Sequence, residues 1–109
     1  MTELFTKDQA LSAVPGLTQP RLAAFIKADL IRPSPAMMFR PIDLARLELL
    51  SDLADQFDLQ GDALGVVMVL IDQLHRARHD LQAIARAMQD EPPALRRRVG
   101  ARLVGFLTL

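Results

Sequence analysis

The fold is decided by residues 16–50, which read GLTQPRLAAFIKADLIRPSPAMMFRPIDLARLELL. Thr18 is placed as the N-cap of a helix, and Pro20 falls in its first turn, where backbone amides have no partner to lose. Pro41 opens a further helix, in which leucines recur every three or four residues and predict one buried stripe. The two prolines of the intervening RPSP predict a loop or small wing, because proline removes donors that a central strand needs.

The region upstream predicts one more helix. Thr6 and Gln9 have the spacing of a capping box, so a helix should run from Lys7 to about Val14. Phe5 is placed to pack against its first turn, and Pro15 and Gly16 end it. The first two helices form a helix-turn-helix-like unit. The apolar residues expected to face its core are Leu22, Phe25, Ile26 and Leu30, followed by Leu44, Leu47, Leu50, Ala54 and Phe57.

The region downstream predicts a long helix. Gly61 should end the third helix, and Asp62 can cap a fourth that runs to about Asp90, before Pro92 and Pro93. Its apolar residues alternate in steps of four and three, which is a coiled-coil seam for a homodimer. After Ala63, this seam consists of Val67, Leu70, Leu74, Ala77, Leu81, Ile84 and Met88. A last helix is expected from Ala94 to about Phe106.

Composition favours a single compact protein. The chain has 109 residues, of which 50% are hydrophobic, and it has no cysteine. We expect residues 1–60 to form the helix-turn-helix and wing with the third helix, and residues 61–109 to pack on it or dimerise. The N-terminus lacks the features of a secretory signal and no apolar run is long enough to span a membrane, so we expect a cytoplasmic protein that does not associate with membranes.

Charge is unevenly distributed although the formal net charge is zero. Residues 1–47 carry six basic and four acidic side chains, a balance of +2. Residues 48–91 carry three basic and nine acidic ones, a balance of −6, and the last 18 residues carry four arginines and no acid. This distribution argues against a broad nucleic-acid-binding surface and favours a basic partner for the acidic middle region.

The sequence offers no pattern typical of an enzyme. His75 and His79 are four residues apart on the long helix, but no third metal ligand stands at a fixed spacing. Phosphate-binding loops, nucleophile elbows and paired catalytic carboxylates are all missing, so we expect no catalysis, no cofactor and no bound metal. Arg96, Arg97, Arg98 and Arg102 fit a solvated face, a partner for the acidic middle region, or phosphate contacts.

The order of elements resembles the winged-helix domain of the MerR family followed by its dimerisation helix. Within that superfamily the chain looks most like the chaperone modulators of the CbpM type. The resemblance covers roughly residues 4–82 and rests on ADLIRP, on Phe39 and Asp43 leading into Leu44, Arg46 and Leu47, and on DLADQFDL passing into ALGVVMVLIDQLHRARHDL.

The chain departs from the DNA-binding branch of that superfamily at two places. Ala23, Ala24 and Phe25 stand where MerR regulators have an Arg-Tyr-Tyr run that grips phosphates. The usual Gly-Tyr-Arg of the wing is replaced by AMM, residues 36–38, which suits apolar contact. The remaining candidates for weak DNA contacts are Thr18, Gln19, Arg21, Lys27, Arg32 and Arg40.

The resemblance to chaperone modulators implies a protein that binds the J-domain of a DnaJ- or CbpA-like co-chaperone and thereby regulates it. J-domains carry a basic second helix, to which the acidic middle region is electrostatically suited. We assign the contact to Glu48, Asp52, Asp55, Asp58 and Asp62, the first three of which lie on one helical stripe. A solvated face is the plain alternative for this stripe. A MerR-like transcriptional regulator remains the alternative function.

Overall fold

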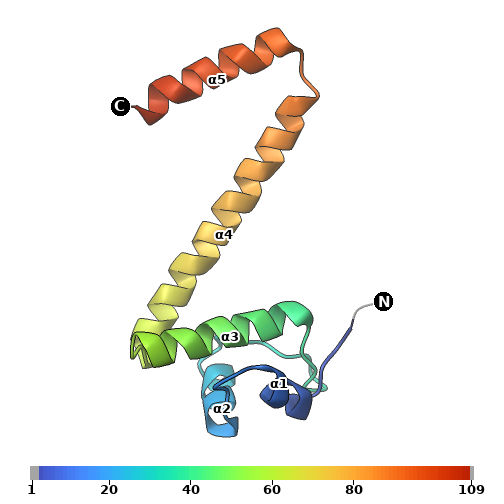
Figure 1. The fold of residues 1–109 in the computed structure, drawn as a ribbon, viewed down its shortest axis with the longest axis vertical. Helices are drawn as coiled ribbons and strands as arrows, with labels where there is room; N and C mark the ends of the chain where they lie inside the picture. The colour runs from blue at the N-terminus through green and yellow to red at the C-terminus, as the bar shows by residue number, and fades with distance from the viewer. Residues whose placement is uncertain (1–2, 109) are drawn as a thin grey trace. The chain divides into compact units, whose positions relative to one another are not determined.

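The computed structural model describes residues 3–108, and all regular secondary structure in that range is helical (Figure 1). Its helices are α1 (Lys7–Ala13), α2 (Gln19–Lys27), α3 (Pro41–Gln56), α4 (Gly61–Gln89) and α5 (Pro93–Leu107). The prediction of an all-helical protein is therefore confirmed. The chain divides into two compact units, Met1–Leu70 and Ile71–Leu109, so that residues 61–70 of α4 belong to the first unit.

The first two helices begin where the sequence predicts, because their N-caps form as expected. The Thr6 hydroxyl accepts a hydrogen bond from the Gln9 amide at 3.2 Å, and the Gln9 side chain accepts one from the Thr6 amide at 2.8 Å. Together these bonds make the predicted capping box. At α2, the Thr18 hydroxyl accepts from the backbone amide of Arg21 at 3.3 Å.

The first unit has a compact aliphatic core with phenylalanines in it. Phe39 is fully buried, and truncating a buried phenylalanine to alanine typically costs about 3–5 kcal/mol. The buried hydrophobic residues of this unit come from every element in it and from the loops between α1, α2 and α3: Ala10, Val14, Leu17, Leu22, Phe25, Ile31, Phe39, Leu47, Leu50, Leu64 and Met68. Ile26 and Leu30, also expected in the core, are only half-buried.

The segment between α2 and α3 forms a tight turn and one isolated β-bridge. Ser34 and Met38 close the turn, with a bond of 3.1 Å from the Ser34 amide to the Met38 carbonyl. Phe5 and Phe39 exchange backbone hydrogen bonds of 2.7 and 2.8 Å. These bonds tie the N-terminal segment to the approach of α3, and no strand forms within residues 3–108.

The prediction of a buried apolar stripe on α3 is wrong for its last residue. Leu47 and Leu50 are buried, and Leu44 and Ala54 are half-buried, but the Phe57 side chain is 66% exposed. The reason is that α3 ends at Gln56 and Phe57 is its C-cap, so the chain has already left the helical path. The buried face is completed by two residues that the apolar pattern could not show, Asp43 and Ser51.

The start of α4 also differs from the prediction. Gly61 does not end α3 but begins α4, with a positive φ of 55° that favours glycine. Asp62 therefore lies in the first turn, where a negative charge is favourable. Leu64 and Met68, one turn apart, bury this end of α4 in the first unit.

The described part of the second unit, residues 71–108, has no buried side chain. Every residue from 71 to 108 is exposed or half-buried, and α5 has no buried residue at all. A helix without a buried face gains little from packing, and an isolated helix of 15 residues such as α5 is only marginally stable in water. The second unit is therefore a set of amphipathic helices with uncovered apolar faces.

Candidate protein-binding and nucleic-acid-binding surfaces

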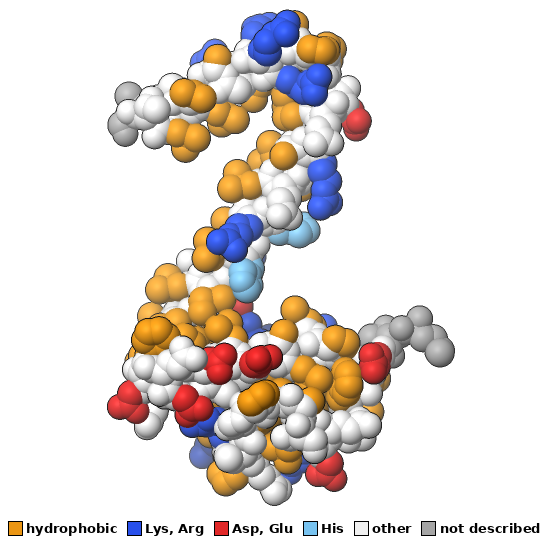
Figure 2. All heavy atoms as spheres, viewed as in Figure 1, with side chains coloured by type: hydrophobic (Ala, Val, Ile, Leu, Met, Phe, Trp, Pro, Cys, Tyr) orange, Lys and Arg blue, Asp and Glu red, His pale blue; other side chains and the backbone are white. Residues whose placement is uncertain are grey.

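Acidic side chains gather over α3 and the turn that follows it (Figure 2). Glu48 and Asp52 are one turn apart on α3 and exposed, because Leu47 and Leu50 bury the other side of the helix. Two further exposed carboxylates follow, on Asp58 in the turn and Asp62 in α4. We call these four residues the acidic surface. Within residues 3–108 none of them forms an ion pair.

Asp55, the fifth residue predicted for that surface, has a different environment. Its carboxylate accepts two hydrogen bonds from the Arg21 guanidinium, at 2.8 and 3.2 Å. The same guanidinium donates to the Gly16 carbonyl at 3.0 Å. The hydrogen bond from Arg21 holds the pKa of Asp55 below its ordinary value. The Arg21–Asp55 pair therefore joins α2 to α3, and Arg21 also joins α2 to the turn that precedes α2.

Two more of the cations predicted to contact DNA are engaged in the same way. Arg32 donates to both carboxylate oxygens of Asp29, at 2.6 and 2.8 Å. Arg40 donates to both oxygens of Asp43, at 3.1 Å each. Paired arginine–carboxylate geometry of this kind is the geometry that an arginine would otherwise offer to a phosphate.

The remaining candidates for DNA contacts are Thr18, Gln19 and Lys27. The Thr18 hydroxyl is used as the N-cap of α2, whereas Gln19 and Lys27 are exposed. Of the four cations proposed for phosphate contacts, only Lys27 has no carboxylate partner in the described part of the chain. The structure thus brings each predicted arginine to a carboxylate and not to a shared basic face.

Asp43 is the one carboxylate that the first unit buries. Only 6% of its side chain is exposed, and it accepts a hydrogen bond of 2.8 Å from the Arg40 backbone amide, closing the first turn of α3. Burial by itself raises the pKa of Asp43. The hydrogen bonds and the positive charge of Arg40, with the charge of Arg46, outweigh burial and hold that pKa below its ordinary value.

The residues of the predicted seam of α4 are mostly exposed to solvent. Leu70, Leu74, Leu81 and Ile84 are 50–66% exposed, Ala77 is exposed, and Val67 and Met88 are half-buried. The residues of α4 that do enter the core, Leu64 and Met68, lie on another stripe. The helix therefore has two apolar stripes, of which residues 3–108 bury the one at its start.

No metal site is assembled in the part of the chain that the structure describes. His75 and His79 are both exposed on α4, and His79 Nδ1 lies 3.8 Å from the carboxylate of Asp80. No group of three potential ligands lies together among residues 3–108. No helix in that range has the length and apolar character to cross a membrane.

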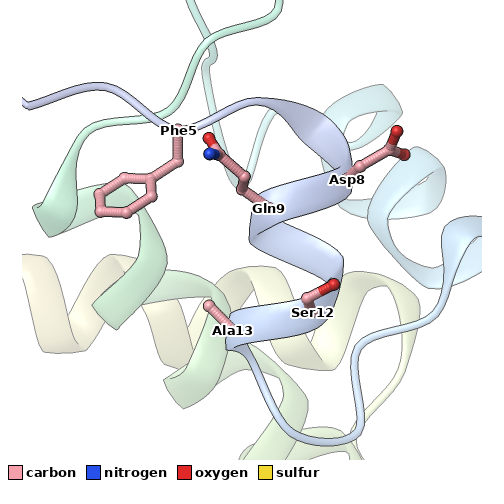
Figure 3. A pocket seen from close by; sticks show the side chains of 5 residues that line it. All are labelled: Phe5, Asp8, Gln9, Ser12 and Ala13. Carbon is pink, nitrogen blue, oxygen red and sulfur yellow. The ribbon is translucent and has the colours of Figure 1, made fainter.

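A shallow hollow lies beside α1 (Figure 3). Phe5 forms one side of it and Ala13 another, with Asp8, Gln9 and Ser12 around them. The Gln9 amide is already held by the capping box, and Asp8 is the one titratable group in the lining.

Sequence reasoning missed the contacts that charged side chains make inside the first unit. Arg46 donates to the Leu30 carbonyl at 2.6 Å, which joins α3 to the end of α2, and Asp43 joins Arg40 to α3. The Arg40–Asp43 spacing of three was visible as a possible helix cap, whereas the Arg46 contact spans sixteen residues and has no local signal.

Comparison of the chain with models of protein families, with curated proteins and with solved structures finds no match.

Proposed function

We propose that this protein is a chaperone modulator, which binds the J-domain of a DnaJ-like co-chaperone through the acidic surface and thereby regulates that co-chaperone. The proposal follows the resemblance described above. It makes the protein a binding partner that does not itself catalyse a reaction.

The observation that supports it is the contrast between two sets of charges in the first unit. The four carboxylates of the acidic surface are exposed and have no cation partner within the described residues. Three of the four candidate phosphate-binding cations, by contrast, are bonded to carboxylates. A surface of this kind attracts a basic partner and presents little positive charge to nucleic acid.

The packing of α3 gives the acidic surface a fixed direction. Leu47 and Leu50 are fully buried on one side, so Glu48 and Asp52 are held toward solvent on a helix that cannot rotate. A basic helix of a J-domain would meet carboxylates from α3 and from the start of α4. Exposed charges of this type mainly accelerate association and determine its salt dependence.

The test is a titration against the J-domain encoded by the same organism, at low and moderate salt. Replacing Glu48 and Asp52 by Lys should slow association and weaken binding by roughly tenfold or more at low salt, because like charges then face each other. A matched control, Asp80→Lys with Asp90→Lys, changes the net charge equally at exposed positions elsewhere. The control should bind almost as the unmodified protein does.

Two outcomes would count against the proposal. Equal affinity of the Glu48/Asp52 variant and the unmodified protein would place the contact on another surface. Absence of any binding by the unmodified protein would reject the chaperone-modulator function itself. A MerR-like DNA-binding role would then be the next candidate, although the pairing of Arg21, Arg32 and Arg40 gives it less support.

A further inference from the structure

Helix α5 carries a narrow apolar stripe along its length. The stripe consists of Leu95, Val99, Leu103 and Phe106, which follow one another in steps of four, four and three residues. That spacing brings them to one side of a helix with about 3.6 residues per turn. Leu103 and Phe106 are 52% and 66% exposed, and α5 has no buried residue. The described residues of the chain therefore leave most of this stripe uncovered.

Arginines lie along both edges of the stripe. Helical geometry places Arg96 at one edge and Arg102 at the other, with Arg97 and Arg98 further round the helix. All four are exposed, and none of them forms an ion pair within residues 3–108. Hydrophobic and basic side chains accordingly gather on different sides of this helix (Figure 2). The helix combines an open apolar stripe with positive charge that has no partner in the described chain.

The positive charge of α5 is local. From Pro92 onward the sequence carries four arginines and no acidic residue, whereas the formal net charge of the whole chain is zero. An anionic surface therefore attracts this helix and not the protein as a whole. The stem of an arginine can lie along apolar surface while its guanidinium group stays among polar groups. Arginines at both edges of an apolar stripe suit a layer of lipid phosphates, which offers partners on either side of the helix.

We propose that α5 is an interfacial helix that binds the surface of a membrane containing anionic phospholipids. Its apolar stripe enters the boundary between headgroups and acyl chains, and Arg96 and Arg102 bond to lipid phosphates on either side. No helix among residues 3–108 can span a membrane, but a helix that lies in the surface needs no span. The proposal thus revises the expectation that the protein does not associate with membranes. It does not depend on the proposed binding of a J-domain, which uses the first unit.

A membrane surface would also stabilise α5. An isolated helix of 15 residues is marginal in water, and Gly100 and Gly105 lower its helix propensity further. An interface that covers the stripe supplies the apolar contacts that the described chain does not. The helical content of the full chain, measured by circular dichroism, should therefore rise when anionic vesicles are added.

The test is co-sedimentation of the full chain with vesicles at low and moderate salt. Vesicles of phosphatidylcholine and phosphatidylglycerol in equal amounts should bind the unmodified protein roughly tenfold or more tightly than vesicles of phosphatidylcholine alone. Arg96→Gln with Arg102→Gln should weaken binding to the anionic vesicles by roughly tenfold or more at low salt. The matched control, Arg76→Gln with Arg78→Gln, removes two exposed arginines of α4 and should bind as the unmodified protein does. All four positions are exposed, so both variants should keep the fold of the first unit.

A single tryptophan reports whether the stripe enters the membrane. The chain has no tryptophan, so Phe106→Trp places one reporter on the stripe, and Ala101→Trp places one on the opposite side of α5. Emission from the Phe106→Trp protein should shift to shorter wavelength when anionic vesicles are added. Emission from the Ala101→Trp protein should change little.

Three results would overturn the inference. The unmodified protein could fail to bind anionic vesicles at low salt, and loss of self-association in the Arg96/Arg102 variant would then assign this face of α5 to a second copy. The Arg96/Arg102 variant and its control could lose binding equally, which would show that the attraction is not specific to α5. The two tryptophan reporters could respond alike, which would show that the stripe does not enter the membrane.

Discussion

Four arginines of the first unit donate hydrogen bonds to carboxylates or carbonyls of the same unit. Arg21 joins α2 to Asp55 of α3 and to the turn before α2. Arg46 joins α3 to the Leu30 carbonyl in the segment that follows α2. Side chains of this kind fix the angles between short helices that apolar packing alone leaves adjustable.

Asp43→Asn should show how much such a contact contributes. The carboxylate is almost fully buried and accepts three hydrogen bonds from Arg40, so removing its charge should lower the free energy of unfolding by about 1–3 kcal/mol at neutral pH. Because the pKa of Asp43 is lowered in the folded state, its contribution is present above the unfolded pKa and is lost as pH falls through the folded pKa. The difference between variant and unmodified protein should therefore shrink below about pH 4.

Urea unfolding at several pH values measures this difference, and Asp52→Asn is its control. Asp52 is exposed on the same helix without an ion pair among the described residues, so its amide variant should change stability little. An Asp43 variant as stable as the control at neutral pH would show that the buried carboxylate contributes nothing net.

At the scale of helices, the sequence predicted most of what depends on local signals. The caps at Thr6 and Thr18 and the prolines that open α3 and α5 act within a few residues, and the helix boundaries lie close to those expected. What the sequence could not show depends on distant contacts. The apolar pattern predicts Phe57 in the core and not Leu64, whereas Phe57 is exposed and Leu64 is buried. The turn between α3 and α4 decides which of these side chains is buried, and the spacing of apolar residues does not show its path.

The end of α2 illustrates a local device that the sequence analysis missed. Asp29 has a φ of 62°, and the amides of Asp29 and Leu30 donate to the carbonyls of Ile26 and Phe25 at 3.0 and 2.9 Å. This is a Schellman motif with aspartate where glycine is usual. The side chain of the same aspartate bonds to Arg32, so one residue ends the helix through its backbone and pairs a candidate DNA contact through its carboxylate.

The pairing of these arginines predicts that α2 and its neighbouring loop bind no specific DNA sequence tightly. Specific binding at about 10⁻⁸ M or better needs phosphate contacts as well as base contacts. Of the cations that the sequence predicts as phosphate contacts, only Lys27 forms no ion pair with a carboxylate in the described part of the chain. Selection from random duplex oligonucleotides should therefore yield no common motif.

The matched variant for this prediction is Asp29→Asn with Asp55→Asn, which releases Arg32 and Arg21 from their carboxylates. It should bind duplex DNA more tightly than the unmodified protein at low salt, with a steeper loss of affinity as salt rises. An inverted repeat recovered with the unmodified protein would reverse the order of the two candidate functions.

For the molecule as a whole, the two units differ in what stabilises them. Eleven hydrophobic residues are buried among residues 3–70, whereas none is buried among residues 71–108. A helix of 29 residues such as α4 continues well past the part that its own chain covers. The heptad-like spacing of its apolar residues predicted a seam, but sequence alone could not show whether α5 would cover it, since both helices are amphipathic.

The seam residues Leu74 and Leu81, seven residues apart, allow a direct test of self-association. Changing both to Asp places two charges in the middle of an apolar stripe that is 50% and 66% exposed at these positions. If two copies pack along this stripe, burying the new carboxylates without partners costs several kcal/mol, and the variant should be monomeric by light scattering. Its first unit should stay folded, since neither side chain enters that core.

The control for this variant is Gln82→Asp with Ala83→Asp, which adds the same two charges to the same helix away from the stripe. Because the control keeps the apolar stripe intact, it should remain as associated as the unmodified protein. If control and seam variant dissociate equally, charge on α4 in general opposes association and the stripe has no special role. If the unmodified protein is itself monomeric, the stripe does not mediate self-association, and its exposed leucines must be covered by a different partner.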